Sequence, residues 1–180
     1  MSRHVGVSAP ERSPGYVEAA LSESSAARAA AEVGRLAHRQ GRTVAIAESL
    51  TGGKLAEVFA AVPDSSAWFA GGVVCFQSET KFRVLGVSRG PVVTEEAVGE
   101  MAAGVAERIG ADAVVSVSGA AGPSDEEGNP PGTVWMATLV CGDLRTELHH
   151  FTGDPLEILS QTVNSATQLL CEALRESASD

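Results

Sequence analysis

The fold is decided by the stretch Thr43-Val44-Ala45-Ile46-Ala47-Glu48-Ser49-Leu50-Thr51-Gly52-Gly53. Its apolar residues predict a buried strand over 43–48, and the pattern that follows predicts a helix over 53–62. Gly52 and Gly53 allow a tight turn between the two elements and a close approach of a ligand to the backbone. The unpaired N–H groups at the start of the helix would face an anion or an oxyanion. Ser49 is therefore expected to stand rigidly at the end of a strand, beside these groups.

Helical and strand patterns alternate on both sides of this stretch. An alanine-rich helix is predicted over 16–40, and a β-branched and aromatic run predicts a buried strand over 71–77. Ser78 is expected to cap a short helix that runs through Leu85. Thr94 is expected to cap the helix after that.

The second half of the chain continues the alternation. A strand is predicted over 113–118 and is followed by a loop rich in glycine and proline that extends to Gly132. Two further strands, over 133–140 and 145–151, are expected to form a hairpin with its turn at 141–143.

The last helix has the clearest start signal in the chain. Asp154 can act as the N-cap, Pro155 occupies the first helical position, and Glu157 can complete a capping box. This helix should run to about Glu176. Helices that alternate with strands imply an α/β protein, and we expect a single-domain, three-layer α/β/α sandwich with a mixed sheet.

Composition limits the class of protein. A chain of 180 residues that is 44% hydrophobic and 20% charged fits one globular domain, which we place at 16–180, behind a disordered N-terminal arm at 1–15. The net charge of -10 opposes nucleic acid or an anionic membrane as the main partner. The sequence contains neither a transmembrane stretch nor the hydrophobic middle of a signal peptide, which predicts a cytoplasmic protein.

Metal and disulfide sites have little support in the sequence. Cys75, Cys141 and Cys171 are odd in number and lack CxxC spacing, so three reduced thiols are expected. His149 and His150 are neighbours in a predicted strand, so their side chains should point to opposite faces of the sheet. We therefore predict that the protein holds no metal ion.

Ser49 and Lys81 are candidates for nucleophilic catalysis. A serine hydroxyl is a weak nucleophile at neutral pH, and a lysine can serve as its base once burial lowers the lysine pKa. Two plainer interpretations stay open, in which Ser49 only caps a helix and Lys81 only lies in solvent.

The segment that surrounds Ser118 is a second candidate site. A strand there enters a loop of small residues that includes Gly119 and Gly122, which suits a phosphate or oxyanion site formed by main-chain N–H groups. The alternative is a tight turn after a buried strand. Neither the Walker motif nor the GxGxxG dinucleotide motif occurs, so ATP and NAD have little support.

With these motifs, the chain resembles the CinA C-terminal domain family, also called the nicotinamide-nucleotide amidase family, over residues 16–174. The resemblance is carried by several segments in one order, namely 47–53, 65–69, 71–81, 85–87, 118–123 and 131–134. It implies an α/β/α fold, a homo-oligomer, and cofactor-free hydrolysis of the amide of nicotinamide mononucleotide, a step of pyridine-nucleotide salvage that yields nicotinate mononucleotide and ammonia. Ser49 matches the nucleophile of the family and Lys81 its motif lysine. The residues expected to contact the substrate are Thr51, Gly52, Gly53, Ser78, Ser118, Gly119 and Gly122.

The chain departs from the family pattern near the expected site. Phe76 stands where the family has a tyrosine, while Pro155 and Leu159 stand where it has arginines. The acidic segment 124–127 replaces a loop opening that is commonly rich in glycine. Two alternatives therefore accompany the amidase hypothesis. One is a catalytically silent binding module, and the other is an amidase for a small amide that lacks a phosphate.

Overall fold

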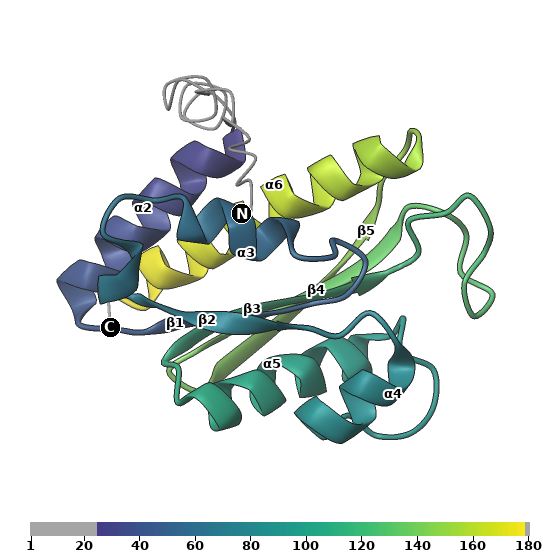
Figure 1. Ribbon diagram of the computed structural model, residues 1–180, viewed down its shortest axis with the longest axis horizontal. Helices are drawn as coiled ribbons and strands as arrows, with labels where there is room; N and C mark the ends of the chain where they lie inside the picture. Colours follow the sequence, from purple (N-terminus) through teal and green to yellow (C-terminus); the bar gives the residue numbers. More distant parts are fainter. Residues whose placement is uncertain (1–24, 179–180) are drawn as a thin grey trace, which may run out of the picture.

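The computed structural model describes residues 25–178, which form a five-stranded sheet in the order β2-β1-β3-β4-β5 (Figure 1). The strands are β1 (Val44–Glu48), β2 (Phe69–Val74), β3 (Ala113–Gly119), β4 (Thr133–Val140) and β5 (Asp143–His150). β1 pairs in parallel with β2 and with β3, whereas β4 pairs antiparallel with β3 and with β5. The prediction of a mixed sheet is therefore confirmed.

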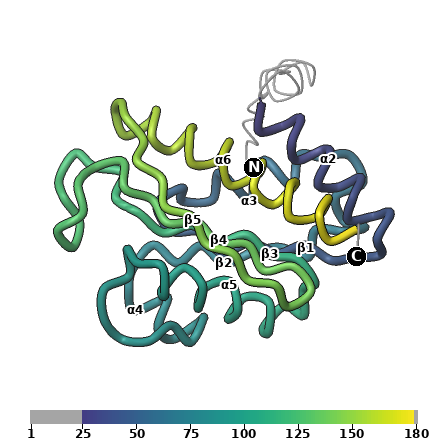
Figure 2. The backbone as a smooth tube through the Cα atoms, turned by 180° about the vertical axis from the view of Figure 1, so that it is seen from behind, coloured from purple at the N-terminus to yellow at the C-terminus, as the bar shows by residue number. Residues whose placement is uncertain are grey.

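Helices cover both faces of the sheet. The helices α2 (Ser25–Gln40), α3 (Lys54–Ala60) and α6 (Pro155–Glu176) lie on one face, and α5 (Glu95–Ile109) and the short α4 (Ser78–Thr80) lie on the other, as Figures 1 and 2 show. The predicted three-layer α/β/α sandwich is confirmed. Within residues 25–178, no helix is long and apolar enough to cross a membrane. The predicted arm at 1–15 and the first part of the predicted helix, at 16–24, lie outside the described residues.

β1 lies between two layers of helices, and all five of its residues are buried. Because side chains alternate along a strand, Val44 and Ile46 join the apolar cluster beneath α2 and α6, while Ala45 and Ala47 join the cluster beneath α5. Glu48 shares a face with Val44 and Ile46, so its carboxylate enters the layer that contains α3.

The predictions for 71–77 and 78–85 need correction. β2 begins at Phe69 and ends at Val74, and its residues alternate between half-buried and exposed. The reason is that β2 is an edge strand, which pairs with β1 alone among the described strands. Ser78 is not a side-chain cap. The N-cap position of α4 belongs to Gln77, and the chain then continues from Lys81 to Leu85 as a π-helical turn, η2.

The predicted caps of α5 and α6 are confirmed. The Thr94 hydroxyl accepts a hydrogen bond from the Ala97 N–H at 3.1 Å, and Asp154 and Glu157 form the full capping box at the start of α6. The hairpin is tighter than expected, since its turn contains only Cys141 and Gly142, both with positive φ. These are the dihedrals of a two-residue turn whose twist matches the flanking strands.

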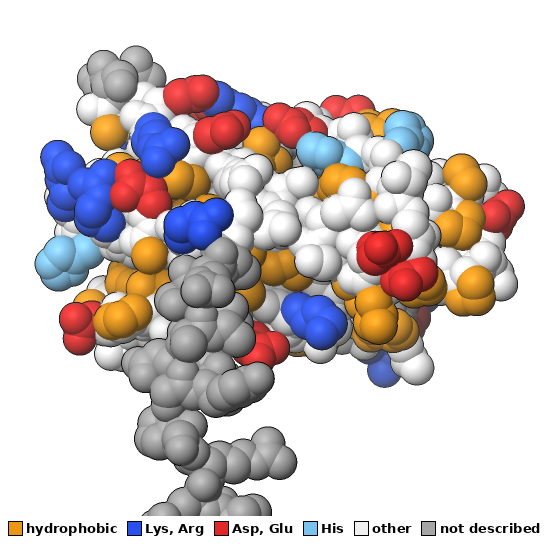
Figure 3. All heavy atoms as spheres, turned by 90° about the horizontal axis from the view of Figure 1, so that it is seen from above, with side chains coloured by type: hydrophobic (Ala, Val, Ile, Leu, Met, Phe, Trp, Pro, Cys, Tyr) orange, Lys and Arg blue, Asp and Glu red, His pale blue; other side chains and the backbone are white. Residues whose placement is uncertain are grey.

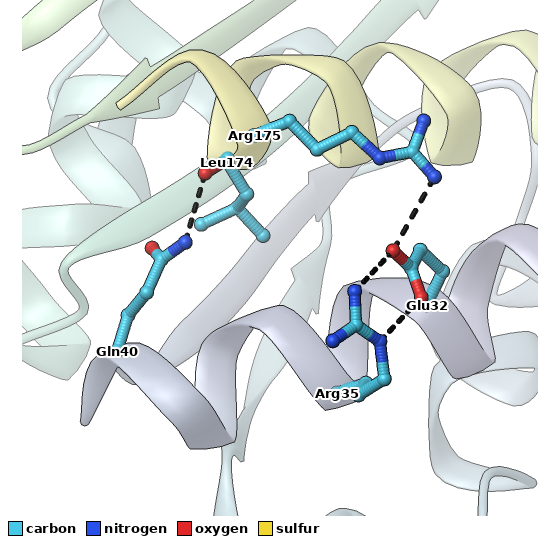
Figure 4. A network of polar contacts seen from close by, with 5 residues as sticks. All are labelled: Glu32, Arg35, Gln40, Leu174 and Arg175. Atoms are coloured by element: carbon cyan, nitrogen blue, oxygen red, sulfur yellow. Dashed lines mark hydrogen bonds and ion pairs between the residues drawn. The ribbon is translucent and has the colours of Figure 1, made fainter. Parts of the chain in front are cut away.

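A polar network joins α2 to α6 along the surface of the molecule (Figure 4). The Glu32 carboxylate accepts hydrogen bonds from Arg35, at 2.6 and 2.7 Å, and from Arg175 at 3.3 Å. These bonds lower the pKa of Glu32 to about 2. Figure 3 looks down on the layer of α2, α3 and α6 and shows basic side chains gathered at the α2 end of this face.

Candidate active site

The fold brings the two candidate catalytic residues together. Ser49 follows β1, at the edge of the sheet where the parallel strands β1, β2 and β3 end, and ligands of α/β proteins commonly bind at this edge. Lys81 opens η2, 32 residues further along the chain, and its Nζ atom lies 2.8 Å from Ser49 Oγ. The Lys81 residue is only 1% exposed, so the interpretation of this lysine as a solvated surface residue is wrong.

Backbone carbonyl groups hold the Lys81 nitrogen in place. Nζ donates to the carbonyl oxygen of Cys75 at 2.9 Å and lies 3.5 Å from that of Phe76. No carboxylate within residues 25–178 forms an ion pair with Lys81. Burial lowers the pKa of Lys81, although the nearby Cys75 thiol and the carboxylates of Glu126 and Glu127 oppose this shift. A lowered pKa favours the neutral amine, which can accept the proton of Ser49.

Glu48 organises the turn that carries Ser49. Its fully buried carboxylate accepts hydrogen bonds from the Thr51 hydroxyl at 2.6 Å and from the N–H groups of Leu55 and Ala56, each at 3.1 Å. The carboxylate thus satisfies the otherwise unpaired donors in the first turn of α3. Sequence reasoning missed this residue, because capping patterns look about three residues ahead and these backbone donors lie seven and eight residues ahead. An acid at the end of an otherwise apolar strand was the available signal.

The two glycines after Ser49 have left-handed backbone conformations, with φ of 60° at Gly52 and 105° at Gly53. The Gly52 N–H donates to the Ser49 carbonyl at 3.1 Å, which closes the turn. In the described part of the chain, the Gly53 N–H has no acceptor, and Gly53 is partly exposed. Thr51 is buried and its hydroxyl is engaged by Glu48, so Gly53 offers the accessible donor among these predicted contact residues.

The Ser118 segment is packed into the structure. The Ser118 hydroxyl is buried and donates to the carbonyl oxygen of Val92 at 2.7 Å. A Cβ atom at Gly119 would lie 2.5 Å from the Thr133 carbonyl oxygen, so the close approach of β3 and β4 explains this glycine. Gly122 has a φ of 87° in the loop that follows. The interpretation as a turn after a buried strand accounts for these contacts, and binding of substrate by Ser118, Gly119 and Gly122 stays a prediction.

The acidic loop borders the same region. Glu127, which has a φ of 54°, accepts hydrogen bonds from the N–H groups of Val92 and Val93 at 2.7 and 3.0 Å. Ser118 and Glu127 therefore anchor the segment before α5 from two sides. The anchoring role of Glu127 was not visible in the sequence, because its partners lie 35 and 34 residues away.

The three positions that depart from the family pattern are also placed. The Phe76 residue is 70% exposed, and only its backbone carbonyl lies near Lys81. Pro155 occupies the first turn of α6, and Leu159 packs against the apolar core. Ser78, another predicted contact residue, is half-buried at the start of α4.

A groove of about 300 Å³ lies between α3 and α6, on the α6 face of the sheet. Its lining consists of Ala26, Lys54, Glu57, Val58, Leu156, Ser160, Val163 and Asn164. Lys54 directly follows Gly53, and none of the ion pairs in residues 25–178 involves it. The groove therefore carries a positive charge at the start of α3, and neither Ser49 nor Lys81 is among its lining residues. The described residues contain no group of three or more His, Cys, Asp and Glu side chains that could hold a metal ion.

The fold and the site define a single-domain α/β/α protein with a buried serine–lysine pair at the carboxyl edge of its parallel strands. Residues 26–174 match the family model of the CinA C-terminal domain, and the chain belongs to this family.

Relatives with names include protein YdeJ of Escherichia coli K12, which is 38% identical over 134 residues, or 71% of this chain and 78% of YdeJ. The nicotinamide-nucleotide amidohydrolase PncC of Escherichia coli K12 is 36% identical over 157 residues, or 83% of this chain and 95% of PncC. Some relatives are longer. The chain spans 37% of a putative competence-damage inducible protein of Halothermothrix orenii, which is 37% identical over 153 residues and 80% of this chain.

The fold is also shared with a solved structure. The crystal structure of a CinA superfamily protein from Klebsiella pneumoniae 700603 superposes with a TM-score of 0.80 and 36% sequence identity. The match covers 84% of this chain and 98% of the other.

Proposed function

We propose that this protein is an amidohydrolase that cleaves the carboxamide of nicotinamide mononucleotide and uses Ser49 as nucleophile and Lys81 as base. The observation that carries the proposal is the 2.8 Å contact between Lys81 Nζ and Ser49 Oγ. This lysine is buried, and no carboxylate of residues 25–178 forms an ion pair with it. The name of the Escherichia coli relative, nicotinamide-nucleotide amidohydrolase, supports the choice of substrate.

In the proposed reaction, neutral Lys81 takes the proton of Ser49, and the serine oxygen attacks the carboxamide carbon. The negative charge that forms on the carboxamide oxygen is stabilised by N–H groups of the turn, of which Gly53 has the accessible one. The Lys81 ammonium returns its proton to the nitrogen of the breaking C–N bond, and ammonia leaves. Water, deprotonated by Lys81, then hydrolyses the acyl-enzyme to the carboxylate and restores Ser49.

The surroundings of the pair support this division of roles. Lys81 Nζ donates a hydrogen bond to the carbonyl oxygen of Cys75 at 2.9 Å, and this bond fixes the position of the amine beside the serine hydroxyl. Glu48 fixes the turn from the other side through three hydrogen bonds. A base and a nucleophile that are both held rigidly need little reorganisation when the proton moves.

A second candidate function is hydrolysis of a small amide that lacks a phosphate. Pro155 and Leu159 favour it, because neither side chain can bind a phosphate and Leu159 packs against the core. Lys54 favours the mononucleotide, since it directly follows Gly53 and is a cation that could replace a lost arginine as the phosphate partner. A catalytically silent binding module is the third hypothesis, and it requires that the Ser49–Lys81 pair perform no chemistry.

Ammonia release from the purified full-length protein tests these hypotheses. The substrates are nicotinamide mononucleotide, nicotinamide riboside and nicotinamide, which differ in phosphate and sugar. Ser49→Ala and Lys81→Met should each abolish release, whereas the exposed controls Ser66→Ala and Arg83→Met should not. Preference for the mononucleotide supports the proposal, and preference for an unphosphorylated amide supports the second candidate. Turnover that survives in Ser49→Ala would rule out the nucleophile.

A further inference from the structure

β5 is an edge strand with one side open. Among the described strands, only β4 pairs with it. The Phe151 N–H donates to the Gly132 carbonyl at 2.9 Å. This bond has the same register as the pairing of Val140 with Asp143 at the two-residue turn. Because backbone groups alternate along an antiparallel strand, odd-numbered residues of β5 point their N–H and C=O groups at β4. The even-numbered residues Leu144, Thr146 and Leu148 point theirs at the open edge.

The side chains of β5 form a complementary sequence about Thr146. Arg145 and Glu147, one residue away on either side, carry opposite charges. Leu144 and Leu148, two residues away, are both apolar, and they remain 47% and 43% exposed. The residues three positions away on either side of Thr146 are the acidic Asp143 and His149. A strand with this symmetry complements a second copy of itself that runs in the opposite direction.

We propose that two copies of this chain associate through antiparallel pairing of their β5 strands, with a two-fold axis at Thr146. The two five-stranded sheets then become one continuous sheet. Thr146 lies opposite Thr146 of the second copy, and their N–H and C=O groups pair directly. Leu144 lies opposite Leu148 of the second copy on the α5 side of the sheet, and Arg145 lies opposite Glu147 of the second copy on the α6 side. This dimer goes beyond the proposed function and does not depend on it.

Electrostatics select this register over its neighbours. A shift that centres the axis on Arg145 places two arginines opposite each other and faces Asp143 with Glu147. A shift that centres the axis on Glu147 places two glutamates opposite each other and faces Arg145 with His149. Like charges directly opposite each other destabilise a sheet, whereas unlike charges stabilise it. A register that pairs even-numbered residues with odd-numbered residues of the second copy is excluded, because backbone donors and acceptors would no longer face each other.

The groups that already surround β5 are compatible with this pairing. Arg145 contacts Asp143 and Glu176, and His149 contacts Glu147 at 3.1 Å, all at exposed or half-exposed side chains that can shift toward a second copy. On the α5 side, a groove of about 450 Å³ lies next to Leu144 and Thr146 and is open to solvent. The Thr146 hydroxyl donates to Glu95 at 2.6 Å, so the Glu95 carboxylates of the two copies lie on either side of the axis and oppose association.

Light scattering and sedimentation of the full-length chain over a range of concentrations test the dimer. We expect a dimer whose dissociation constant rises about tenfold or more in Arg145→Glu, because two attractive pairs become two repulsive ones. The exchange Arg145→Glu with Glu147→Arg restores the pairs and should restore the dimer, while the distant exposed control Arg83→Glu should change nothing. Glu95→Gln should strengthen association. A monomer at all concentrations, or a charge exchange that fails to restore a dimer lost in Arg145→Glu, would overturn the proposal.

Cross-linking tests the register independently. Cα atoms of a hydrogen-bonded antiparallel pair lie about 5.5 Å apart, within reach of a disulfide. In a Cys141→Ser background, which removes the exposed native thiol, Thr146→Cys should form a covalent dimer on oxidation. Leu144→Cys alone should not, because its partner is Leu148, but Leu144→Cys combined with Leu148→Cys should. Efficient cross-linking of Leu144→Cys alone would contradict the register.

Discussion

Replacing the buried Glu48 should weaken both the fold and the site. In Glu48→Gln, the amide oxygen can still accept from the Thr51 hydroxyl and the Leu55 N–H, but the amide NH₂ then faces the Ala56 N–H, which is also a donor. The partly buried Ala56 N–H and the new amide NH₂ then face each other without an acceptor, which costs at least about 1–3 kcal/mol. We therefore expect the free energy of unfolding to fall by about 2 kcal/mol. In Glu48→Ala, all three donors lose their acceptor, and the fall should reach about 4 kcal/mol, because the loss of a buried charge removes some desolvation cost.

Urea-induced unfolding measures the first effect and ammonia release the second. Loosening the turn moves Ser49 relative to Lys81, so kcat should fall by about a hundredfold for a displacement of about 1 Å, with less change in KM. Glu107→Gln, at an exposed position of α5, is the matched control and should leave stability unchanged. An unfolding free energy in Glu48→Gln equal to that of the unmodified protein would refute the reasoning, since the carboxylate would then not be needed as the acceptor for α3.

Four further predictions concern single groups or pairs. Because burial lowers the pKa of Lys81 and the base must be neutral, kcat/KM for the amide should rise with pH and reach its plateau below the ordinary lysine pKa; a continued rise up to that pKa would contradict this. The stabilisation by Glu32 is fully present above the unfolded pKa of 4.5 and is lost as pH falls toward about 2, so thermal unfolding should separate Glu32→Gln from the unmodified protein at pH 7 but not near pH 2, with exposed Glu172→Gln as control. A chelator should leave turnover intact, and loss of activity that zinc restores would disprove this. Phe76→Tyr with Leu159→Arg should raise hydrolysis of the mononucleotide about tenfold or more if the missing groups limit it, and steady-state kinetics that do not change would show that they are dispensable.

The sequence by itself determined the local elements of this protein. Several local features were predictable because each depends on residues only a few positions apart. They are the caps at Thr94 and Asp154, the turn between β4 and β5, and the glycine turn after Ser49. The alternation of helices with strands then indicated the sandwich. The glycine turn after a buried strand indicated Ser49, and the need of a weak nucleophile for a base indicated Lys81. The family motifs agreed with both.

Only the tertiary structure decided how distant groups meet. The 2.8 Å contact between Ser49 and Lys81 joins residues 32 apart, and Ser118 bonds to Val92 across 26 residues. The π-helical turn at Lys81–Leu85 packs closely against α5 at Gly104. Only glycine fits there, because a Cβ atom would lie 2.0 Å from the Leu85 carbonyl oxygen. Such contacts depend on packing between elements, and no pattern within one element encodes them. Whether a strand lies at the centre or the edge of the sheet was decided in the same way, and this left β2 half exposed and one side of β5 open.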